Sequence, residues 1–330
     1  MIANYHTHTP RCNHAVGSEE EYVQQALKAG IKILGFSDHT PYLFPGDYYS
    51  TFRMHPEELP GYVATVNGLK ETYKGQLELH VGLEAEYYPA YFPQTLDYLR
   101  EQGVEYLLLG QHFVGNEPVG SYSVRQTDDP ALLERYCRQC IAAMETGMYT
   151  YIAHPDILNF TGSPDIYRQW MLTLIREARN CGVYLEFNQL GYFEKRNYPN
   201  PKFLELAAEE NMPMILGCDA HQPEALGRKE LQAEILELLK KYGIQVLDTV
   251  PLRHISNSPP GNFPRAGNIK PTNPPALRNE KAGGFLSASL SYPDHRKKQR
   301  PALLLYAAIM ERVTRLELAT STLARWRSTG

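Results

Sequence analysis

The sequence predicts an α/β fold in which helices surround a parallel, barrel-like sheet. Seven short apolar runs, each long enough for one strand, alternate with segments that have helical caps or helical apolar spacing. Most of these runs are followed directly by side chains that commonly bind metals, at the strand ends where barrels of this kind place their functional residues. The chain of 330 residues is long enough for one barrel of about 250 residues and an extension.

The expected elements alternate along the first three quarters of the chain. We expect strands at residues 1–3, 31–36, 77–83, 106–110, 149–153, 183–187 and 213–217. We expect helices at residues 18–30, 55–74, 93–102, 130–147, 164–181, 201–211 and 224–242. The first helix begins with a capping box, Ser18-Glu19-Glu20-Glu21, and ends at Gly30. Strand and helix in alternation are typical of a parallel sheet, because each helix carries the chain back to start the next strand.

Side chains that can bind metals gather where these strands end. His6 and His8 lie two residues apart in an extended segment, so both imidazoles should point to the same side. Asp219 and His221 repeat this spacing after the last apolar run. Seven of the 11 histidines fall in such segments when the loop residue His14 is included. The remaining candidates are His39, Glu84, His112 and His154.

Asp38 and Glu86 are further carboxylates close to these strand ends. Asp38 precedes His39, and Glu86 follows Glu84 by two residues. Carboxylates beside metal-binding histidines often accept a hydrogen bond from the second ring nitrogen and so orient the imidazole. Both are candidates for this role.

Other histidine and cysteine residues are interpreted as structural. His80 lies inside an expected strand. Cys137 and Cys140 lie three residues apart in an apolar helix with no second pair, which favours buried thiols over a metal site. Cys218 is expected to pack beside the site, because alternation in a strand directs it away from Asp219.

Composition bounds the class of protein. Five cysteines without regular spacing argue against a disulfide framework and favour a reducing compartment. The chain begins without a signal-peptide pattern and has no apolar stretch of membrane-spanning length, so we expect a cytoplasmic protein without a membrane partner. The first 255 residues carry a net charge of −12, which does not suit binding to nucleic acid.

The last quarter of the chain differs in character. Residues 256–330 contain twelve Lys and Arg against four Asp and Glu, and many prolines with little apolar periodicity. We therefore expect a barrel domain at residues 1–255 and a disordered or loosely attached extension at residues 256–330. A short basic amphipathic helix at about residues 301–323 is an alternative for the end of this extension.

Six motifs in this order resemble the polymerase and histidinol phosphatase (PHP) superfamily, and the resemblance covers roughly residues 2–250. Within the superfamily, the loop that contains His14, the segment Leu185-Glu186-Phe187-Asn188 and the segment Gly217 to His221 look most like the monofunctional histidinol-phosphatases. The six motifs are His6-Thr7-His8, Ser37-Asp38-His39, Gly82-Leu83-Glu84, Gln111-His112, Ala153-His154-Pro155 and Asp219-Ala220-His221.

The resemblance implies a distorted (β/α)7 barrel, similar to a TIM barrel, with three divalent or transition metal ions. Glu84 would bridge two of the ions, and Glu84, Asp219 and His221 would take part in catalysis. Nitrogen-rich ligation suits Zn, Mn or Fe better than Mg or Ca, and the sequence does not choose among the three. The implied ligands are His6, His8, His14, His39, Glu84, His112, His154, Asp219 and His221.

The activity that the resemblance implies is hydrolysis of L-histidinol phosphate to L-histidinol and phosphate, in the penultimate step of histidine biosynthesis. We expect attack by a metal-bound hydroxide without a phospho-enzyme, since no nucleophile motif or glycine-rich phosphate loop competes with the metal site. Arg196 is the preferred phosphate-binding residue, with Arg53 and Arg125 as further candidates. Asp219 and a metal-bound water are both options for the general acid.

Two alternative functions remain open at this point. The first is a PHP phosphoesterase that acts on another small phosphate ester or a nucleotide. The second is a nuclease module associated with a DNA polymerase, against which the acidic barrel and the lack of a polymerase body argue. The oligomeric state is not predicted.

Overall fold

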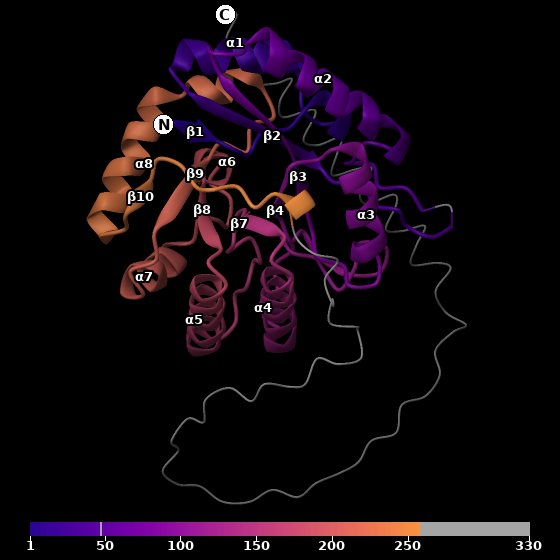
Figure 1. The fold of residues 1–330 in the computed structure, drawn as a ribbon. Helices are drawn as coiled ribbons and strands as arrows, with labels where there is room; N and C mark the ends of the chain where they lie inside the picture. The colour runs from indigo at the N-terminus through magenta and orange to yellow at the C-terminus, as the bar shows by residue number, and fades with distance from the viewer. Residues whose placement is uncertain (47, 258–330) are drawn as a thin grey trace, which may run out of the picture. The chain divides into compact units, whose positions relative to one another are not determined.

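The computed structural model describes residues 1–46 and 48–257, which form a parallel sheet with helices around it (Figure 1). The sheet order is β1-β2-β3-β4-β7-β8-β9-β10, and all its neighbouring strands are parallel. The barrel-like α/β fold is therefore confirmed. The strands are β1 (Ala3–Asn4), β2 (Ile33–His39), β3 (Glu78–Ala85), β4 (Tyr106–Leu109), β7 (Tyr149–Ile152), β8 (Tyr184–Asn188), β9 (Met214–Gly217) and β10 (Val246–Leu247).

Seven of these strands coincide with the predicted apolar runs, and the structure adds three short ones. The eighth strand of the sheet, β10, has only two residues, too few for a readable alternation pattern. A separate antiparallel pair, β5 (Phe113–Val114) and β6 (Ser121–Tyr122), follows β4. Pairing with neighbours in space, rather than local sequence, makes these residues strands.

The helices follow the predicted alternation. Ser18 accepts a hydrogen bond from the Glu21 amide and Glu21 accepts one from the Ser18 amide, so the predicted capping box begins α1. The predicted helix at 224–242 is instead a 3₁₀ turn at Pro223–Gly227 followed by α8, and the short α6 was not predicted. The α-helices are α1 (Glu19–Ala29), α2 (Leu59–Thr72), α3 (Phe92–Gln102), α4 (Pro130–Glu145), α5 (Pro164–Asn180), α6 (Gln189–Phe193), α7 (Pro201–Glu209) and α8 (Lys229–Tyr242).

The first and ninth strands meet through the segments that follow them. Thr7 forms a parallel bridge with Ala220, with His8 N donating to Ala220 O at 2.9 Å and Ala220 N donating to His6 O at 3.2 Å. This pairing joins the two segments that carry the His-x-His and Asp-x-His spacings. Residues more than 200 positions apart in the chain therefore lie side by side at the carboxyl ends of the strands.

The opposite end of the barrel is filled with aromatic and aliphatic side chains. Tyr5, Tyr106 and Val250 belong to one buried cluster, and the Tyr106 hydroxyl donates to the Tyr5 carbonyl at 2.7 Å. The segment after β10 pairs with β4 through the antiparallel bridge between Tyr106 and His254. The polar site thus lies at one end of the strands, while this packing closes the other end.

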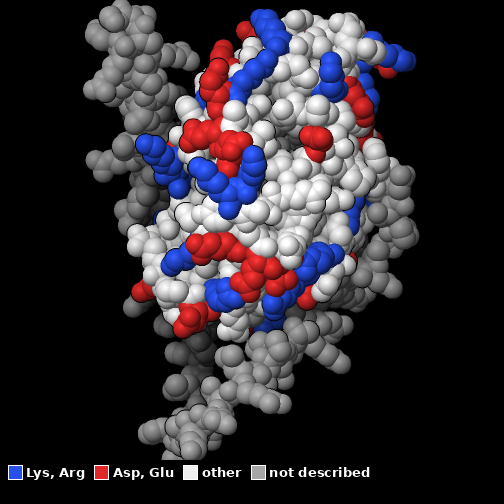
Figure 2. Space-filling view, turned by 90° about the vertical axis from the view of Figure 1, so that its left-hand side faces the viewer, with Lys and Arg blue, Asp and Glu red and all other residues white. Residues whose placement is uncertain are grey.

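Charges of both signs are interspersed on the face shown in Figure 2, among the residues that the structure describes. Ion pairs link elements at the surface, such as Arg168 with Glu209 at 2.6 Å and Arg176 with Glu210 at 2.7 Å. Of the described helices, none has the length and apolar character to cross a membrane. The expected disorder and the helix at 301–323 lie outside the described residues, so the division at residue 255 stays a prediction.

Glu105 supplies a test of stability at the end of the barrel away from the metal-binding side chains. Burial by itself would raise the pKa of Glu105, but His80 at 3.0 Å and Lys70 at 2.5 Å lower it from 4.5 to about 2. The carboxylate therefore stabilises the fold above pH 4.5, and this contribution is lost as the pH falls towards 2. We expect Glu105→Gln to lower the free energy of unfolding by about 1–2 kcal/mol at pH 7, with a smaller difference below pH 4.

Urea unfolding of the chelator-treated protein at several pH values measures this effect. Glu71→Gln is the matched control, because Glu71 is exposed and pairs with Lys74 only at 3.7 Å. An equal loss in both variants, or a difference independent of pH, would contradict the stabilising role of Glu105.

Candidate metal centre

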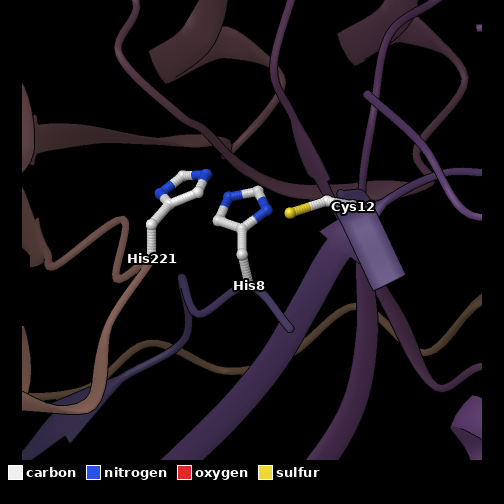
Figure 3. Close-up of side chains that lie close together, drawn as sticks. All are labelled: His8, Cys12 and His221. Atoms are coloured by element: carbon white, nitrogen blue, oxygen red, sulfur yellow. The ribbon is translucent and has the colours of Figure 1, made fainter. Parts of the chain in front are cut away.

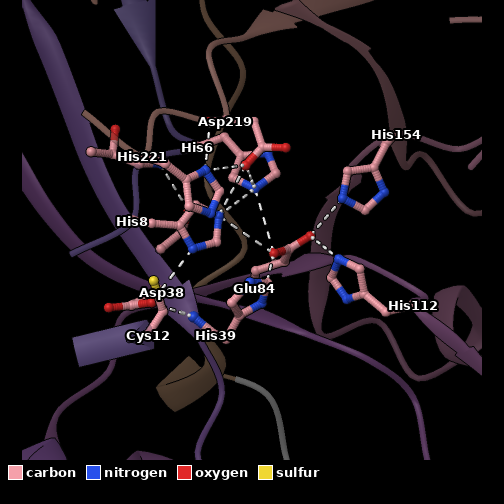
Figure 4. Close-up of polar contacts among 12 residues, drawn as sticks. His6, His8, Cys12, Asp38, His39, Glu84, His112, His154, Asp219 and His221 are labelled. Atoms are coloured by element: carbon pink, nitrogen blue, oxygen red, sulfur yellow. Dashed lines mark hydrogen bonds and ion pairs between the residues drawn. The ribbon is translucent and has the colours of Figure 1, made fainter. Parts of the chain in front are cut away.

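The nine predicted ligands all lie at the carboxyl ends of the strands, and Figure 4 shows most of them converging on Glu84. Five overlapping sets of three groups have ligand atoms within 4.8 Å of one another. Most of these side chains are buried, so the fold collects many metal-binding groups in a small volume. Strand alternation explains why His6 and His8 face the same way, since both lie close to Asp219.

Glu84 is the central carboxylate of the site. Its Oε1 lies 2.8 Å from His154 Nε2 and 3.4 Å from His112 Nε2. Its Oε2 lies 3.1 Å from His39 Nδ1, 3.6 Å from the Nε2 atoms of His6 and His8, and has no hydrogen bond. Burial by itself would raise the pKa of Glu84, but His112, His6 and other imidazoles hold it well below its usual value. The side chain is therefore an ionised carboxylate that offers each oxygen to a different group of imidazoles.

Asp219 faces the first two histidines. Its Oδ1 lies 3.1 Å from His8 Nε2 and 3.4 Å from His6 Nε2, and its Oδ2 accepts from Asn188 Nδ2 at 3.1 Å. Burial by itself would raise the pKa of Asp219, but His6 and His8 hold it well below the usual range. The backbone of Asp219 is left-handed, with φ of 48°, which turns the carboxylate towards the histidines.

Three histidines form a further group at the side of the site. His14 Nε2 and His221 Nε2 lie 2.9 Å apart, and His39 completes a set with suitable spacing for a metal. Burial, followed by the charge of His8, holds the pKa values of His39 and His221 well below the usual value. Both are therefore neutral imidazoles, the form that binds metal ions, while His14 is exposed beside them.

Cys12 also reaches this centre, which the sequence analysis did not predict. It is fully buried, and Figure 3 shows its sulfur directed at His8, with His221 on the other side of the His8 ring. The three side chains form one of the sets with metal-ligand spacing. Burial, followed by the charge of Asp38, raises the pKa of the Cys12 thiol. The position of Cys12 two residues before His14 was the available signal in the sequence.

Three carboxylates orient the imidazoles from behind. Glu186 Oε1 lies 2.8 Å from His6 Nδ1, Glu86 Oε1 lies 2.9 Å from His112 Nδ1, and Asp38 Oδ1 lies 3.4 Å from His8 Nδ1. Such partners leave the other ring nitrogen directed at the site. The geometry agrees with the orienting role expected for Glu86, while His8 Nδ1 has no hydrogen bond and the role of Asp38 stays a prediction. The sequence analysis did not predict the contact of Glu186 with His6. The local sequence of the strand at 183–187 does not indicate a contact with a residue 180 positions away.

The three predicted arginines have different surroundings. Arg196 lies at the edge of the site, where its Nη1 donates to Tyr198 Oη at 2.9 Å and the Tyr198 ring packs 5.5 Å from that of His154. Arg125 is exposed just after β6. Arg53 is only 1% exposed and is held by Glu86 and Glu117. The predicted substrate contact of Arg53 stays a prediction, and the structure shows two carboxylates bound to its guanidinium.

The residues interpreted as structural lie as expected. His80 contacts Glu78 at 2.9 Å and Glu105 at 3.0 Å. Cys137 and Cys140 are fully buried in α4, and burial raises the pKa of the Cys140 thiol to about 12. Cys218 is buried beside the site, 3.4 Å from Gln189 Nε2.

These observations define a class of protein: a parallel α/β barrel with a centre suited to several metal ions. The donor set fits such ions, because imidazole nitrogens and carboxylate oxygens from separate strand ends lie within 3.6 Å of one another, the atoms that transition metals bind. Glu84 Oε2 and His39 Nδ1 are both buried without a hydrogen bond, although they lie 3.1 Å apart. A cation bound between these two atoms would give both of them a partner.

Comparison with known proteins identifies the family. The PHP domain family matches residues 4–190. A protein named "Probable histidinol-phosphatase" from Deinococcus radiodurans is 31% identical over 232 residues, which cover 68% of this chain and 88% of that protein. The chain belongs to the PHP domain family, which confirms the resemblance seen in its motifs.

Two further proteins are similar over most of their length. Histidinol-phosphatase from Bacillus subtilis is 25% identical over 260 residues, which cover 67% of this chain and 94% of that protein. The histidinol phosphate phosphatase of Lactococcus lactis, whose structure contains zinc, L-histidinol and phosphate, is 18% identical with a TM-score of 0.58. That likeness covers 76% of this chain and 98% of the other, and it supports the fold.

Gly110 tests the placement of Glu84. A Cβ atom at Gly110 would lie 1.9 Å from Glu84 Oε1 and 2.4 Å from Glu84 Cδ. Gly110→Ala should therefore displace the central carboxylate, and we expect metal affinity to fall by a factor of at least about 10. Gly61→Ala is the control, since a Cβ there meets nothing within 4 Å and alanine favours a helix such as α2 by about 1 kcal/mol. Zinc titration of both variants checks this, and unchanged zinc affinity in Gly110→Ala would show that Glu84 is not a ligand.

Proposed function

We propose that this chain is a metal-dependent phosphatase that hydrolyses L-histidinol phosphate to L-histidinol and phosphate in histidine biosynthesis. The observation that carries the proposal is the ring of imidazoles around buried Glu84. The chain also spans 88% and 94% of two relatives that are named as histidinol-phosphatases. A phosphomonoester is a dianion, and its hydrolysis needs the charge neutralisation that a cluster of cations provides.

The proposed metal ligands fall into three groups around the two oxygens of Glu84. His6, His8 and Asp219 form the first group, and the Nε2 atoms of the two histidines lie 3.6 Å from Glu84 Oε2. The second consists of His112 and His154 at Glu84 Oε1. The third consists of His14, His39 and His221. We propose three ions of Zn, Mn or Fe, since this nitrogen-rich set suits transition metals.

The chemistry supplied by such ions, when bound, is neutralisation of the phosphoryl charge and a lower pKa of water. Asp219 lies beside this chemistry as a proton acceptor. Burial by itself would raise the pKa of Asp219, but His6 and His8 hold it well below the usual range, so the carboxylate is ionised and can take a proton from the attacking water. His221 would take part by holding an ion through its Nε2, since its Nδ1 lies 3.0 Å from the Asp219 carbonyl. Asp219 and a metal-bound water both stay options for the general acid.

Arg196 is proposed to bind the phosphoryl oxygens. Its guanidinium is fixed by Tyr198, and its Nη2 lies 2.7 Å from Glu194 Oε2 at a side chain that is 37% exposed. A phosphate dianion can replace Glu194 as the partner of the Arg196 guanidinium, because an arginine binds phosphate with two parallel hydrogen bonds.

Phosphate release from L-histidinol phosphate by metal-reconstituted protein tests the proposed function. Sugar phosphates, nucleotides and DNA ends form the comparison panel. We expect selective turnover of L-histidinol phosphate, loss of turnover with a chelator, and a loss of at least about 100-fold in His8→Ala. His254→Ala is the control, because His254 is exposed and pairs with Tyr106 through its backbone at the other end of the barrel. If the protein hydrolyses another ester but not L-histidinol phosphate, the proposed substrate is wrong. The proposed metal site would not be affected by that result.

Replacing Arg196 tests the phosphate contact. A hydrogen-bonded charge pair is worth about 1.5–3 kcal/mol, so Arg196→Met should lower kcat/KM by about 10–100-fold while the bound metal stays the same. Steady-state kinetics and metal analysis of the same sample measure both. Arg168→Met, which removes a surface ion pair with Glu209, should leave the kinetics unchanged. Normal kinetics in Arg196→Met would exclude this arginine as a substrate contact.

A further inference from the structure

Arg53 is a buried cation next to the metal centre, and its contacts link four separate segments. Its Nε and Nη2 donate to Glu117 Oε2 at 2.9 and 2.6 Å, and Nη2 also donates to Glu86 Oε1 at 2.5 Å. Its Nη1 donates to the carbonyl of Thr40, the residue after β2, at 3.1 Å. Four of the five N–H groups of the guanidinium therefore donate to acceptors in the protein. The Arg53 side chain is only 1% exposed.

The contact with Glu86 leads directly to a predicted metal ligand. Glu86 Oε1 is shared between Arg53 Nη2 at 2.5 Å and His112 Nδ1 at 2.9 Å. While Nδ1 of His112 contacts Glu86, its Nε2 faces Glu84 at 3.4 Å. The orientation of the His112 ring thus depends on the position of Glu86, which Arg53 holds.

The main chain of Arg53 is tied to the loop that carries His14. Its carbonyl accepts from Asn13 Nδ2 at 3.1 Å and from Tyr49 Oη at 3.0 Å. Asn13 has a left-handed backbone, with φ of 67°, immediately before His14. Hydrogen bonds therefore hold both the main chain and the side chain of Arg53, so that its guanidinium has a fixed position.

Without Arg53, Glu86 and Glu117 would be two buried carboxylates that share one small volume. Glu86 is buried completely and Glu117 is 3% exposed. Two such charges repel each other and lack water to screen them, so the two carboxylates would move apart. This change alters the acceptor of the His112 imidazole.

We propose that Arg53 is a positioning residue that holds Glu86 against His112 and thereby sets the orientation of one imidazole of the metal centre. The inference rests on the proposed function, because it concerns the same centre. It assigns Arg53 a role through Glu86 and His112, with no contact to the substrate.

The effect of Arg53 on metal binding, measured without substrate, tests this proposal. Chelator-treated protein is titrated with Zn²⁺ against a competing chromophoric chelator, and bound zinc is counted by mass spectrometry. We expect Arg53→Met to weaken the binding of one zinc equivalent by about 10–100-fold, the usual effect of losing a partner behind a ligand. Glu86→Gln should weaken the same equivalent, and the double variant should be no weaker than Arg53→Met. Arg168→Met should bind zinc as the unaltered protein does.

Several results would overturn the proposal. Lower stability of Arg53→Met with unchanged zinc binding would show a purely structural role, and a raised KM with full zinc content would show a substrate contact. Additive losses in the double variant would show that Arg53 does not act through Glu86. If Arg53→Met does not fold, the zinc affinities of Arg53→Lys and Glu86→Gln test the proposal instead. Lysine keeps the charge but cannot bridge both carboxylates in the same way, so we expect an intermediate loss of zinc, and normal zinc binding in Glu86→Gln would contradict the proposal.

The zinc titration is independent of the substrate assignment. If the unaltered protein does not hydrolyse L-histidinol phosphate, the proposed function fails while the zinc result for Arg53 still stands.

Discussion

A buried carboxylate surrounded by imidazoles is the interaction on which the site depends. Glu84 is 1% exposed, and nitrogens of five histidines lie within 3.6 Å of its two oxygens. A buried charge needs compensating partners, and here those partners come from strands spread along the whole barrel. No single helix or strand could assemble them. The metal centre therefore depends on the folded sheet, as is usual when metal ligands come together only in the folded state.

The same demand accounts for two of the five non-glycine residues that have a positive φ in the described part of the chain. His154 and Asp219 have left-handed backbones, with φ of 33° and 48°, which cost about 1–3 kcal/mol each for residues other than glycine. The neighbours hold both residues in place. The His154 amide donates to Glu186 at 2.9 Å, and Asp219 is held by His8 and Asn188. Strain thus occurs at the two strand ends where a side chain must turn into the site.

Much of the fold could be predicted because its signals are local. Each predicted apolar run became a strand, and the capping box at Ser18 begins α1. Short elements such as β10 and α6 were not predicted, because a segment of two to five residues is too short to show a periodic pattern of apolar residues. Among the site residues, His-x-His and Asp-x-His could be recognised from alternation. Cys12 and Glu186 could not, since their neighbours in the site are set by loops and strands far away in the chain.

The sequence by itself determined where seven strands lie and that His6 and His8 share one side, because both follow from apolar runs and from a period of two. The family could be recognised from the ends of those strands. Tertiary structure alone decided how the ends meet, through the pairing of Thr7 with Ala220, and what each arginine does. Arg53 and Arg196 are alike as arginines in loops between regular elements. One is enclosed by Glu86 and Glu117 and the other remains at the edge of the site, because burial and charge neighbours depend on packing between distant segments.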